Sequence, residues 1–185
     1  MIRPLYFHNP NQEGFEAIIK HLHSKNYKFI SIEELYSRLE KNDTKGKLAY
    51  ISFDDGWQGN LKLIPIIEKY NVHITIFIAV NPIMSGNFWW EFVAKKVGYT
   101  QMQNFKNLPH DEFESQLKKI KTEVADLQRS AMTIDELETI TKHPLISIQS
   151  HTINHPILTK LPDDLLDFEL SESQKQLEKI TGKSI

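Results

Sequence analysis

The run Val72–Val80 constrains the fold more than any other feature of the sequence, because it is apolar on both faces of an extended chain. Strands of this kind occur in parallel sheets that are covered by helices on both sides. The run is less than half as long as the roughly 20 apolar residues that a membrane-spanning helix needs. We therefore expect Val72–Val80 to form a buried strand of a parallel sheet.

Segments with strand patterns alternate with segments whose apolar residues recur at helical spacing. This alternation is typical of α/β proteins. No Gly/Ser-rich or Pro-rich linker and no repeat divides the chain, so we expect one domain over residues 1–185. The expected strands are Ile2–Phe7, Tyr27–Ile30, Leu48–Phe53, Val72–Val80 and Leu145–Ile148, and the expected helices are Glu13–Lys25, Ile32–Leu39, Asn60–Tyr70, Glu112–Leu127, Thr133–Lys142 and Asp164–Ile180.

The composition excludes several classes of protein. The chain has 22 Lys plus Arg against 24 Asp plus Glu, a formal net charge of −2. No overall positive field therefore indicates nucleic acid or an anionic membrane as a partner. The chain has no cysteine, which excludes disulfides, Cys-ligated zinc, iron–sulfur clusters and a thiol nucleophile. Any metal site must be built from histidines and carboxylates.

The first residues do not have the pattern of a signal peptide. Pro4, His8 and Pro10 interrupt the apolar run that a signal peptide requires. No window of the sequence is long and apolar enough for a membrane span. As given, the chain is predicted to be soluble, without a membrane anchor and cytoplasmic.

The first candidate site is Asp54-Asp55-Gly56, directly after the strand expected at Leu48–Phe53. Ligands of α/β proteins bind at the carboxyl ends of the strands. Successive side chains of a strand point to opposite faces, so the two carboxylates are suited to two separate tasks. The competing interpretation is a plain polar turn, since Asp and Gly are common in turns. Trp57 follows at once and is expected to line the site as a substrate-binding residue.

The second candidate site is His151-Thr-Ile-Asn-His155-Pro156, which follows the strand expected at Leu145–Ile148. Histidines four residues apart lie on the same side of a helical turn and could bind one ion through neutral imidazole nitrogens. Pro156 disfavours a helical conformation at His155. We therefore expect a single turn in a loop, with surface or packing roles as the alternative for each histidine.

The two candidate sites support each other because both lie just beyond strand ends of one predicted sheet. Together they offer two imidazoles and a carboxylate, and three such ligands with an open position for water form a catalytic type of metal site. One aspartate of the pair is left over as a natural base.

At these residues the sequence resembles the polysaccharide deacetylases, the NodB-homology domains of carbohydrate esterase family 4. The segment Ile51–Gly56 is similar to the T-F-D-D-G motif of that family, and Ser150–Pro156 is similar to its H-[ST]-x-x-H-P motif. Weaker similarities extend over nearly the whole chain. The resemblance implies a distorted (β/α) barrel, usually of seven strands.

The resemblance also implies roles for single residues. Asp55, His151 and His155 would bind a divalent metal ion, with zinc favoured and cobalt or nickel acceptable to the same ligands. Asp54 would be the general base. The substrate would be an N-acetylated glycan, from which the enzyme would release acetate and leave a free amino sugar.

The sequence departs from the family pattern in two places. Gln149 stands where the family tends to have a small residue. The later segments of the family, an Arg/Pro-containing segment, an acidic-Trp segment and a Leu-His segment whose His serves as the general acid, are not found in this sequence. We expect a barrel that is incomplete at its C-terminal end. The chain would then be a fragment, would need strands from another chain, or would keep a metal site without efficient catalysis.

Three functions therefore remain open from the sequence. The first is a metal-dependent deacetylase of an amino-sugar polysaccharide or its precursor. The second is a catalytically incomplete domain that binds metal or glycan and needs a partner or a missing segment; an open barrel edge would also allow two copies to pair. The third is a metal-free hydrolase of cyclic amides, which the presence of both imidazoles disfavours.

Overall fold

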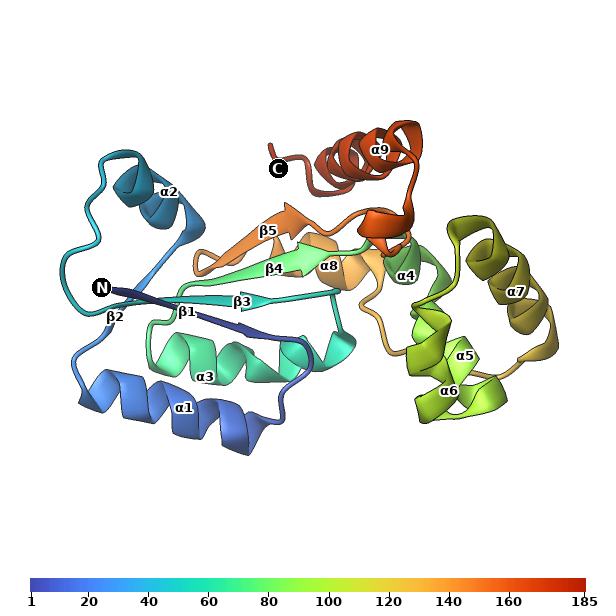
Figure 1. Cartoon of the computed structure of the whole chain (residues 1–185). Coiled ribbons are helices and arrows are strands. Elements are labelled where there is room, and N and C mark those ends of the chain that lie inside the picture. Colours follow the sequence, from blue (N-terminus) through green and yellow to red (C-terminus); the bar gives the residue numbers. More distant parts are fainter.

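The computed structural model describes residues 1–185 and is built around a parallel sheet of five strands (Figure 1). Strand β1 pairs with β3 along its full length, with Ile2 opposite Leu48 and Phe7 opposite Phe53. The other side of β3 is shared, because β2 pairs with its first half and β4 with its second half. The strands are Ile2–Phe7 (β1), Lys28–Ile30 (β2), Leu48–Phe53 (β3), Ile74–Ile78 (β4) and Ile146–Ser150 (β5).

The two central strands carry the sequence pattern that predicted them. All six residues of β3 are buried, and so are four of the five residues of β4. Because both faces of these strands are covered, apolar residues are favoured at every position. The predicted α/β class and the parallel sheet are confirmed. Strand β5 pairs with β4, so β1 and β5 are the outer strands of the order β1-β3-β4-β5, and the short strand β2 lies off this path beside β3.

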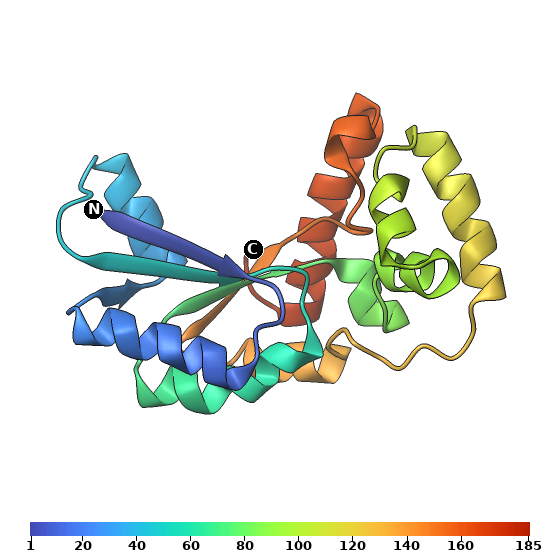
Figure 2. The same cartoon turned by 60° about the horizontal axis from the view of Figure 1, so that its bottom comes forward.

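Helices lie on both sides of the sheet (Figures 1 and 2). Helices α1 and α3 lie along one face, and α9 lies on the other side against β5. The helices are Gln12–Ser24 (α1), Ile32–Glu40 (α2), Gln58–Leu63 (3₁₀ helix η1), Ile64–Lys69 (α3), Val80–Ser85 (α4), Trp89–Val97 (α5), Tyr99–Phe105 (α6), His110–Glu123 (α7), Ile134–Ile140 (α8), Leu158–Lys160 (3₁₀ helix η2) and Asp163–Thr181 (α9).

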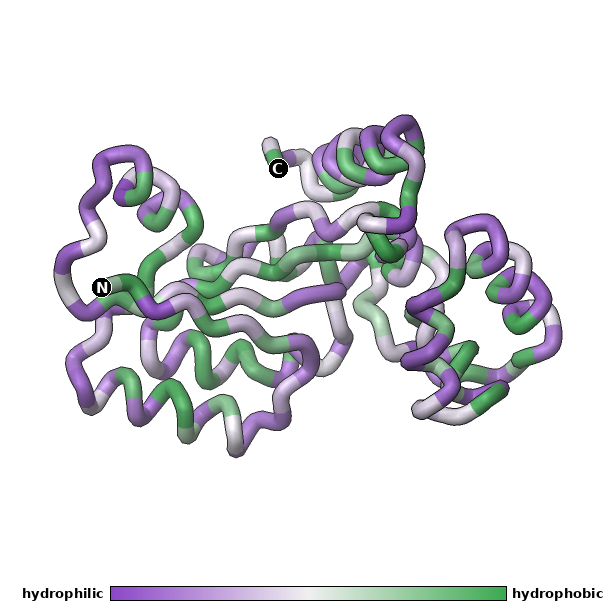
Figure 3. The backbone as a smooth tube through the Cα atoms, in the orientation of Figure 1, coloured by the Kyte–Doolittle hydropathy of each residue, from purple (hydrophilic) through white to green (hydrophobic).

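The main hydrophobic core joins the sheet to the helices α1, α3, α8 and α9. Phe15 of α1 is fully buried and its ring centroid is 5.4 Å from that of Phe53 at the end of β3. Figure 3 shows the central strand β4 as largely hydrophobic, whereas the helices alternate between hydrophobic and hydrophilic positions. Each large apolar side chain that leaves water contributes roughly 1.5–3 kcal/mol. This core fixes the position at which β3 ends, and therefore the position of the aspartates that follow.

A second core belongs to α5, α6 and α7, which form a group beyond the carboxyl ends of the strands (Figures 1 and 2). Phe113 of α7 lies between Trp89 and Phe105, with ring centroids 5.0 Å and 5.1 Å away. The sequence predicted α7 but not α4, α5 or α6. Each of these three helices has nine residues or fewer, which is too short for a clear periodic signal.

Most other predicted elements agree with the structure within a few residues. The capping signal at Thr133 is confirmed, since its side chain accepts the backbone N–H of Glu136 and Glu136 bonds back to the Thr133 N–H. The closed seven-stranded barrel stays a prediction, because these five strands form a sheet with two edges. None of the helices combines the length and the apolar character needed to cross a membrane.

Candidate metal centre

The turn after β3 places Asp54 and Asp55 at the carboxyl end of the sheet. The Asp54 N–H donates to the Phe7 carbonyl at 2.8 Å, which continues the pairing of β1 with β3. The chain then turns sharply through Asp55 and Gly56, whose φ angles are 76° and 92°. A Cβ atom at Gly56 would lie 2.9 Å from Cδ1 of Ile78. Both its φ angle and the close approach of β4 therefore favour glycine at this position.

The histidines come from the loop after β5. The His151 N–H donates to the Ile78 carbonyl at 2.9 Å, so His151 stands where the pairing of β4 with β5 ends. The loop then bends through left-handed conformations at Thr152 (φ 71°) and His155 (φ 54°). The segment is a loop rather than a helical turn. It nevertheless returns His155 to the side of His151, with ring centroids 4.9 Å apart.

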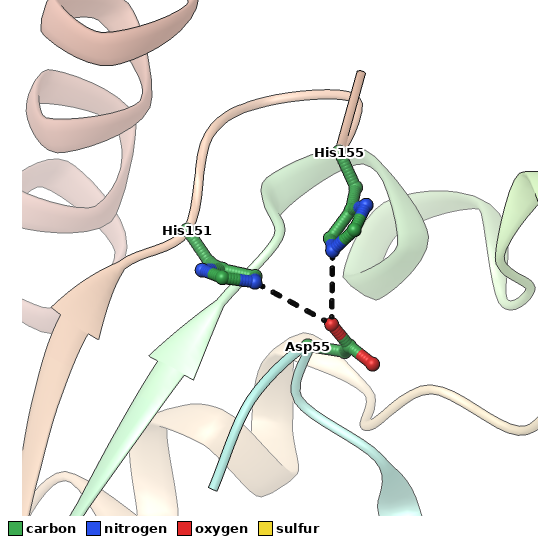
Figure 4. A group of neighbouring side chains, drawn as sticks. All are labelled: Asp55, His151 and His155. Atoms are coloured by element: carbon green, nitrogen blue, oxygen red, sulfur yellow. Dashed lines mark ion pairs between the residues drawn. The ribbon is translucent and has the colours of Figure 1, made fainter. Parts of the chain in front are cut away.

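The side chains of Asp55, His151 and His155 point toward one another (Figure 4). Nε2 of His155 lies 3.2 Å from Oδ1 of Asp55, and Nε2 of His151 lies 3.6 Å from the same oxygen. One ligand atom from each residue lies within 4.8 Å of the others. The structure thus brings together the three residues that the sequence suggested as ligands.

The chemistry of this cluster fits a divalent cation. Oδ1 of Asp55 is buried and, despite the two nearby imidazoles, has no hydrogen-bond partner of good geometry. An unpaired buried carboxylate oxygen is costly. Two imidazole nitrogens and one carboxylate oxygen are the ligand set of catalytic zinc sites that keep a position open for water. A cation between the three atoms would satisfy the buried oxygen.

The second carboxylate oxygen of Asp55 is held by a neighbour. The indole N–H of Trp57 donates to Oδ2 at 2.9 Å. Burial alone would raise the pKa of Asp55, but the contact with His155 and the bond from Trp57 outweigh it, so the pKa lies below its ordinary value. Asp55 is therefore ionised at neutral pH, as a metal ligand must be.

Asp54 and His151 have pKa values shifted by burial. Burial raises the pKa of the half-buried Asp54 carboxyl, and the charges of His151 and His8 offset this only in part. Burial and the neighbouring His155 lower the pKa of His151, which the two aspartates partly counteract. The neutral imidazole that binds metal is thereby favoured at His151. Asp54 is favoured as a proton acceptor, because a carboxylate of higher pKa is a stronger base.

A cavity of about 300 Å³ opens onto the cluster. Asp55, His155 and Trp57 line it from the sheet side, and Trp90 of α5 lines it from the other side. The Trp90 ring stacks on Phe88, with centroids 4.7 Å apart, and its edge meets His155 at 4.9 Å. Trp57 thus lies where the sequence expected it, while its indole N–H is used by Asp55.

Sequence reasoning missed several residues that build the site. The buried Trp89 donates its indole N–H to the His155 carbonyl at 3.0 Å. Tyr99 and Gln103 of α6 line the cavity, together with Lys106 directly after this helix. No local signal exists for α6, because its residues reach the site only through the packing of α5–α7.

An open parallel sheet with an Asp–His–His cluster at its carboxyl edge defines an α/β protein in which three neighbouring side chains could hold a metal ion. A family model described as polysaccharide deacetylase matches residues 41–185. The chain belongs to the polysaccharide deacetylase family.

The comparisons with single proteins agree with this family. The Bacillus subtilis (strain 168) protein YxkH, whose name places it among the polysaccharide deacetylases, is 24% identical over 168 residues, which cover 90% of this chain. The chain spans 44% of the length of that relative.

The solved structures share the fold at low sequence identity. The Streptococcus pyogenes deacetylase PplD in complex with acetate has a TM-score of 0.66 at 19% identity, covering 99% of this chain and 69% of that chain. IcaB from Ammonifex degensii has a TM-score of 0.68 at 14% identity, covering 99% and 70%. The Bacillus cereus polysaccharide deacetylase BC0361 has a TM-score of 0.64 at 20% identity, covering 100% and 48%.

Proposed function

We propose that the protein is a metal-dependent hydrolase that removes N-acetyl groups from an amino-sugar polysaccharide or its precursor and releases acetate. The observation that carries this proposal is the convergence of Asp55, His151 and His155 beside a second, unused carboxylate, Asp54. Family membership supports the reaction class. The chain would act as one domain over residues 1–185.

Asp55, His151 and His155 would hold the metal ion. A bound divalent ion, zinc or a similar metal, would activate water and polarise the acetamide carbonyl. Asp54 would accept the proton of the attacking water, since its half-buried carboxyl has a raised pKa. The water oxygen would add to the acetyl carbon, the C–N bond would break, and the proton taken up by Asp54 would pass to the leaving amine, which gives acetate and the free amino sugar.

The cavity beside the cluster would bind the sugar that carries the acetamide. Its volume of about 300 Å³ lies at the lower end of ligand pockets. The half-buried rings of Trp57 and Trp90 offer the flat apolar surface on which sugar rings pack. Trp57 would thus bind substrate and orient Asp55.

The experiment that tests this function replaces the proposed base. In the zinc-loaded chain, Asp54→Asn should lower acetate release from N-acetylglucosamine oligomers by about 10²–10⁴-fold, the typical contribution of a general base. Zinc affinity should stay close to that of the wild type, because Asp54 is not among the proposed ligands. Asp111→Asn is the matched control, since Asp111 is an exposed aspartate of α7. Equal rates for Asp54→Asn and the wild type would exclude Asp54 as the base.

A second function is favoured by the two edges of the sheet. Strands β1 and β5 each have one side without a neighbouring strand, and such edges can pair with further strands or with another copy. Under this second function, the chain is a metal-binding or glycan-binding domain that becomes active only when additional strands pair with these edges. Zinc binding by the wild type without acetate release would favour this function, and an increase in mass at high concentration would reveal pairing between copies.

A further inference from the structure

The loop that carries the two histidines has a strained backbone and few hydrogen bonds of its own. Thr152 and His155 are both left-handed, with φ angles of 71° and 54°. Neither is a glycine, and such conformations cost of the order of 1–3 kcal/mol each. The only bond of the loop within itself that involves a side chain runs from the His155 N–H to Oγ1 of Thr152 at 3.0 Å. Contacts from outside the loop must therefore maintain its shape.

The carbonyl groups of the loop are bound by α4. The N–H of Val80 donates to the Thr152 carbonyl at 3.1 Å, and the N–H of Asn81 donates to the Ile153 carbonyl at 2.8 Å. Both donors belong to the first turn of α4, whose N–H groups have no partner within their own helix. One side of the loop backbone is therefore fixed by the element that follows β4.

The N–H groups of the loop are bound by a single side chain of α9. Oε2 of Glu169 accepts the N–H of Ile153 at 2.8 Å and the N–H of Asn154 at 3.0 Å. Its Oε1 accepts the side-chain amide of Asn154 at 2.6 Å. Glu169 is 7% exposed, which is unusual for a carboxylate without a cationic partner. Its carboxyl group instead accepts hydrogen bonds from two peptide N–H groups that lie between His151 and His155.

One turn further along α9, Ser173 binds the end of β5. Its hydroxyl lies 2.5 Å from the hydroxyl of Ser150, the residue directly before His151. Ser173 is fully buried. The face of α9 that turns toward the sheet is thus polar at two successive turns, where apolar residues would be expected of a packed helix. Both polar residues contact the segment that carries the histidines.

We propose that Glu169 is a positioning residue of the metal centre. It fixes the peptides between His151 and His155 so that both imidazoles face Asp55 before the cation arrives. This inference rests on the proposed metal function and adds a residue from outside the ligand set. Residues that orient metal ligands typically change metal affinity by 10–100-fold when they are replaced.

Zinc titration of three variants tests this role. Glu169→Leu keeps the approximate volume but leaves the two N–H groups without an acceptor, and it should weaken zinc binding by about 10–100-fold. Glu169→Gln keeps one oxygen as acceptor for the two N–H groups. The Asn154 amide, which bonds to Glu169 and to the Asn81 amide, can rotate together with Asn81 to accept the new N–H group of the glutamine. This variant should therefore bind zinc nearly as tightly as the wild type. Glu172→Leu is the matched control, because Glu172 bonds only to Lys175 and Gln176 of its own helix.

The readouts separate positioning from general stability. Calorimetric titration measures zinc affinity, the visible absorption of bound Co²⁺ reports ligand geometry, and thermal unfolding of the metal-free chain measures stability. A merely structural role would lower the melting temperature and leave affinity and the Co²⁺ spectrum unchanged. That result for folded Glu169→Leu would overturn the proposal.

Two further comparisons keep the test decisive. If Glu169→Leu does not fold, Glu169→Asp replaces it: the charge stays but the acceptor is one methylene short. Tighter zinc binding by Glu169→Gln than by Glu169→Asp supports positioning, whereas the reverse order means that charge alone matters and overturns it. A wild-type chain that does not bind zinc would instead refute the proposed metal centre itself, and this inference with it.

Discussion

Asp55 combines features that a structural residue would not need. Its carboxylate is 1% exposed, one oxygen is held by Trp57, and the other faces two imidazoles without a hydrogen bond. Asp55 also has a left-handed backbone, which for residues other than glycine is uncommon and clusters at functional sites. These features together favour a metal ligand over the plain polar turn that the sequence also allowed.

Removal of one imidazole tests the ligand set directly. His155→Ala should reduce zinc affinity by more than the roughly 10–100-fold that loss of a supporting residue costs, because two ligands remain of three. Equilibrium dialysis with metal analysis measures the bound zinc. His21→Ala is the control, since His21 is an exposed histidine near the end of α1. Full zinc stoichiometry and affinity in His155→Ala would show that His155 is not a ligand.

At the level of elements, the site depends on where the three strands β3, β4 and β5 end. The turn after β3 and the loop after β5 are tied to each other through β4: the Ala79 N–H donates to the Asp55 carbonyl at 3.1 Å, and the Ile78 carbonyl accepts from His151 at 2.9 Å. A shift of β4 would therefore move both halves of the site. Helix α1 and helix α3 hold β3 and β4 in register from one face of the sheet.

An ion pair between α1 and α3 predicts a pH dependence of stability. Glu16 accepts from Nζ of Lys69 at 2.8 Å and from the hydroxyl of Tyr70 at 3.0 Å. These bonds lower the pKa of Glu16 from 4.5 to about 2. A carboxyl whose pKa is lower in the folded state stabilises the fold above its unfolded pKa. This stabilisation is lost as the pH falls from about 4.5 toward 2.

Glu16→Gln should therefore cost stability at neutral pH and little in strong acid. The free energy of unfolding, measured with urea at several pH values, should converge for wild type and variant as the pH approaches 2. The difference should also shrink at high salt, because the pair is exposed. Glu13→Gln, an exposed acid of the same helix without an ion pair, is the control. A constant difference at all pH values would contradict the assignment.

At the level of the whole molecule, the two larger hydrophobic cores of the chain belong to different parts of the structure. The larger one supports the sheet, and the smaller one belongs to α5–α7, of which α5 and α6 form one wall of the cavity. Trp90 packs against both cores, and Trp89 of the smaller core donates its indole N–H to the carbonyl of His155. We expect the helical group to open as a cooperative unit of its own.

Phe113→Ala tests this separation. Loss of a buried phenylalanine typically costs about 3–5 kcal/mol, and Phe113 lies between Trp89 and Phe105. Hydrogen exchange should show reduced protection in α5–α7 and unchanged protection in β3 and β4. Phe168→Ala is the control, because Phe168 is 54% exposed on α9. A uniform loss of protection over sheet and helices would show that the molecule opens as one unit.

Local patterns were sufficient to predict the sheet and the two halves of the site. Strand β3 agrees with its predicted bounds, because a run that is buried on both faces excludes most other conformations. The predicted strand over Val72–Val80 was longer than β4, since its last residues turn into α4. A short apolar run at the end of Val72–Val80 is compatible with a buried helix as well as with a buried strand.

The sequence by itself determined the α/β class and the ends of the strands at which Asp55, His151 and His155 stand, because both follow from periodicity and from the chemistry of a few residue types. The tertiary structure alone decided that Glu169 and Trp89 support the histidine loop and that α6 lines the cavity. These contacts join residues from different elements. Which residues meet depends on how the helices pack against one another, and no local pattern in the sequence encodes that.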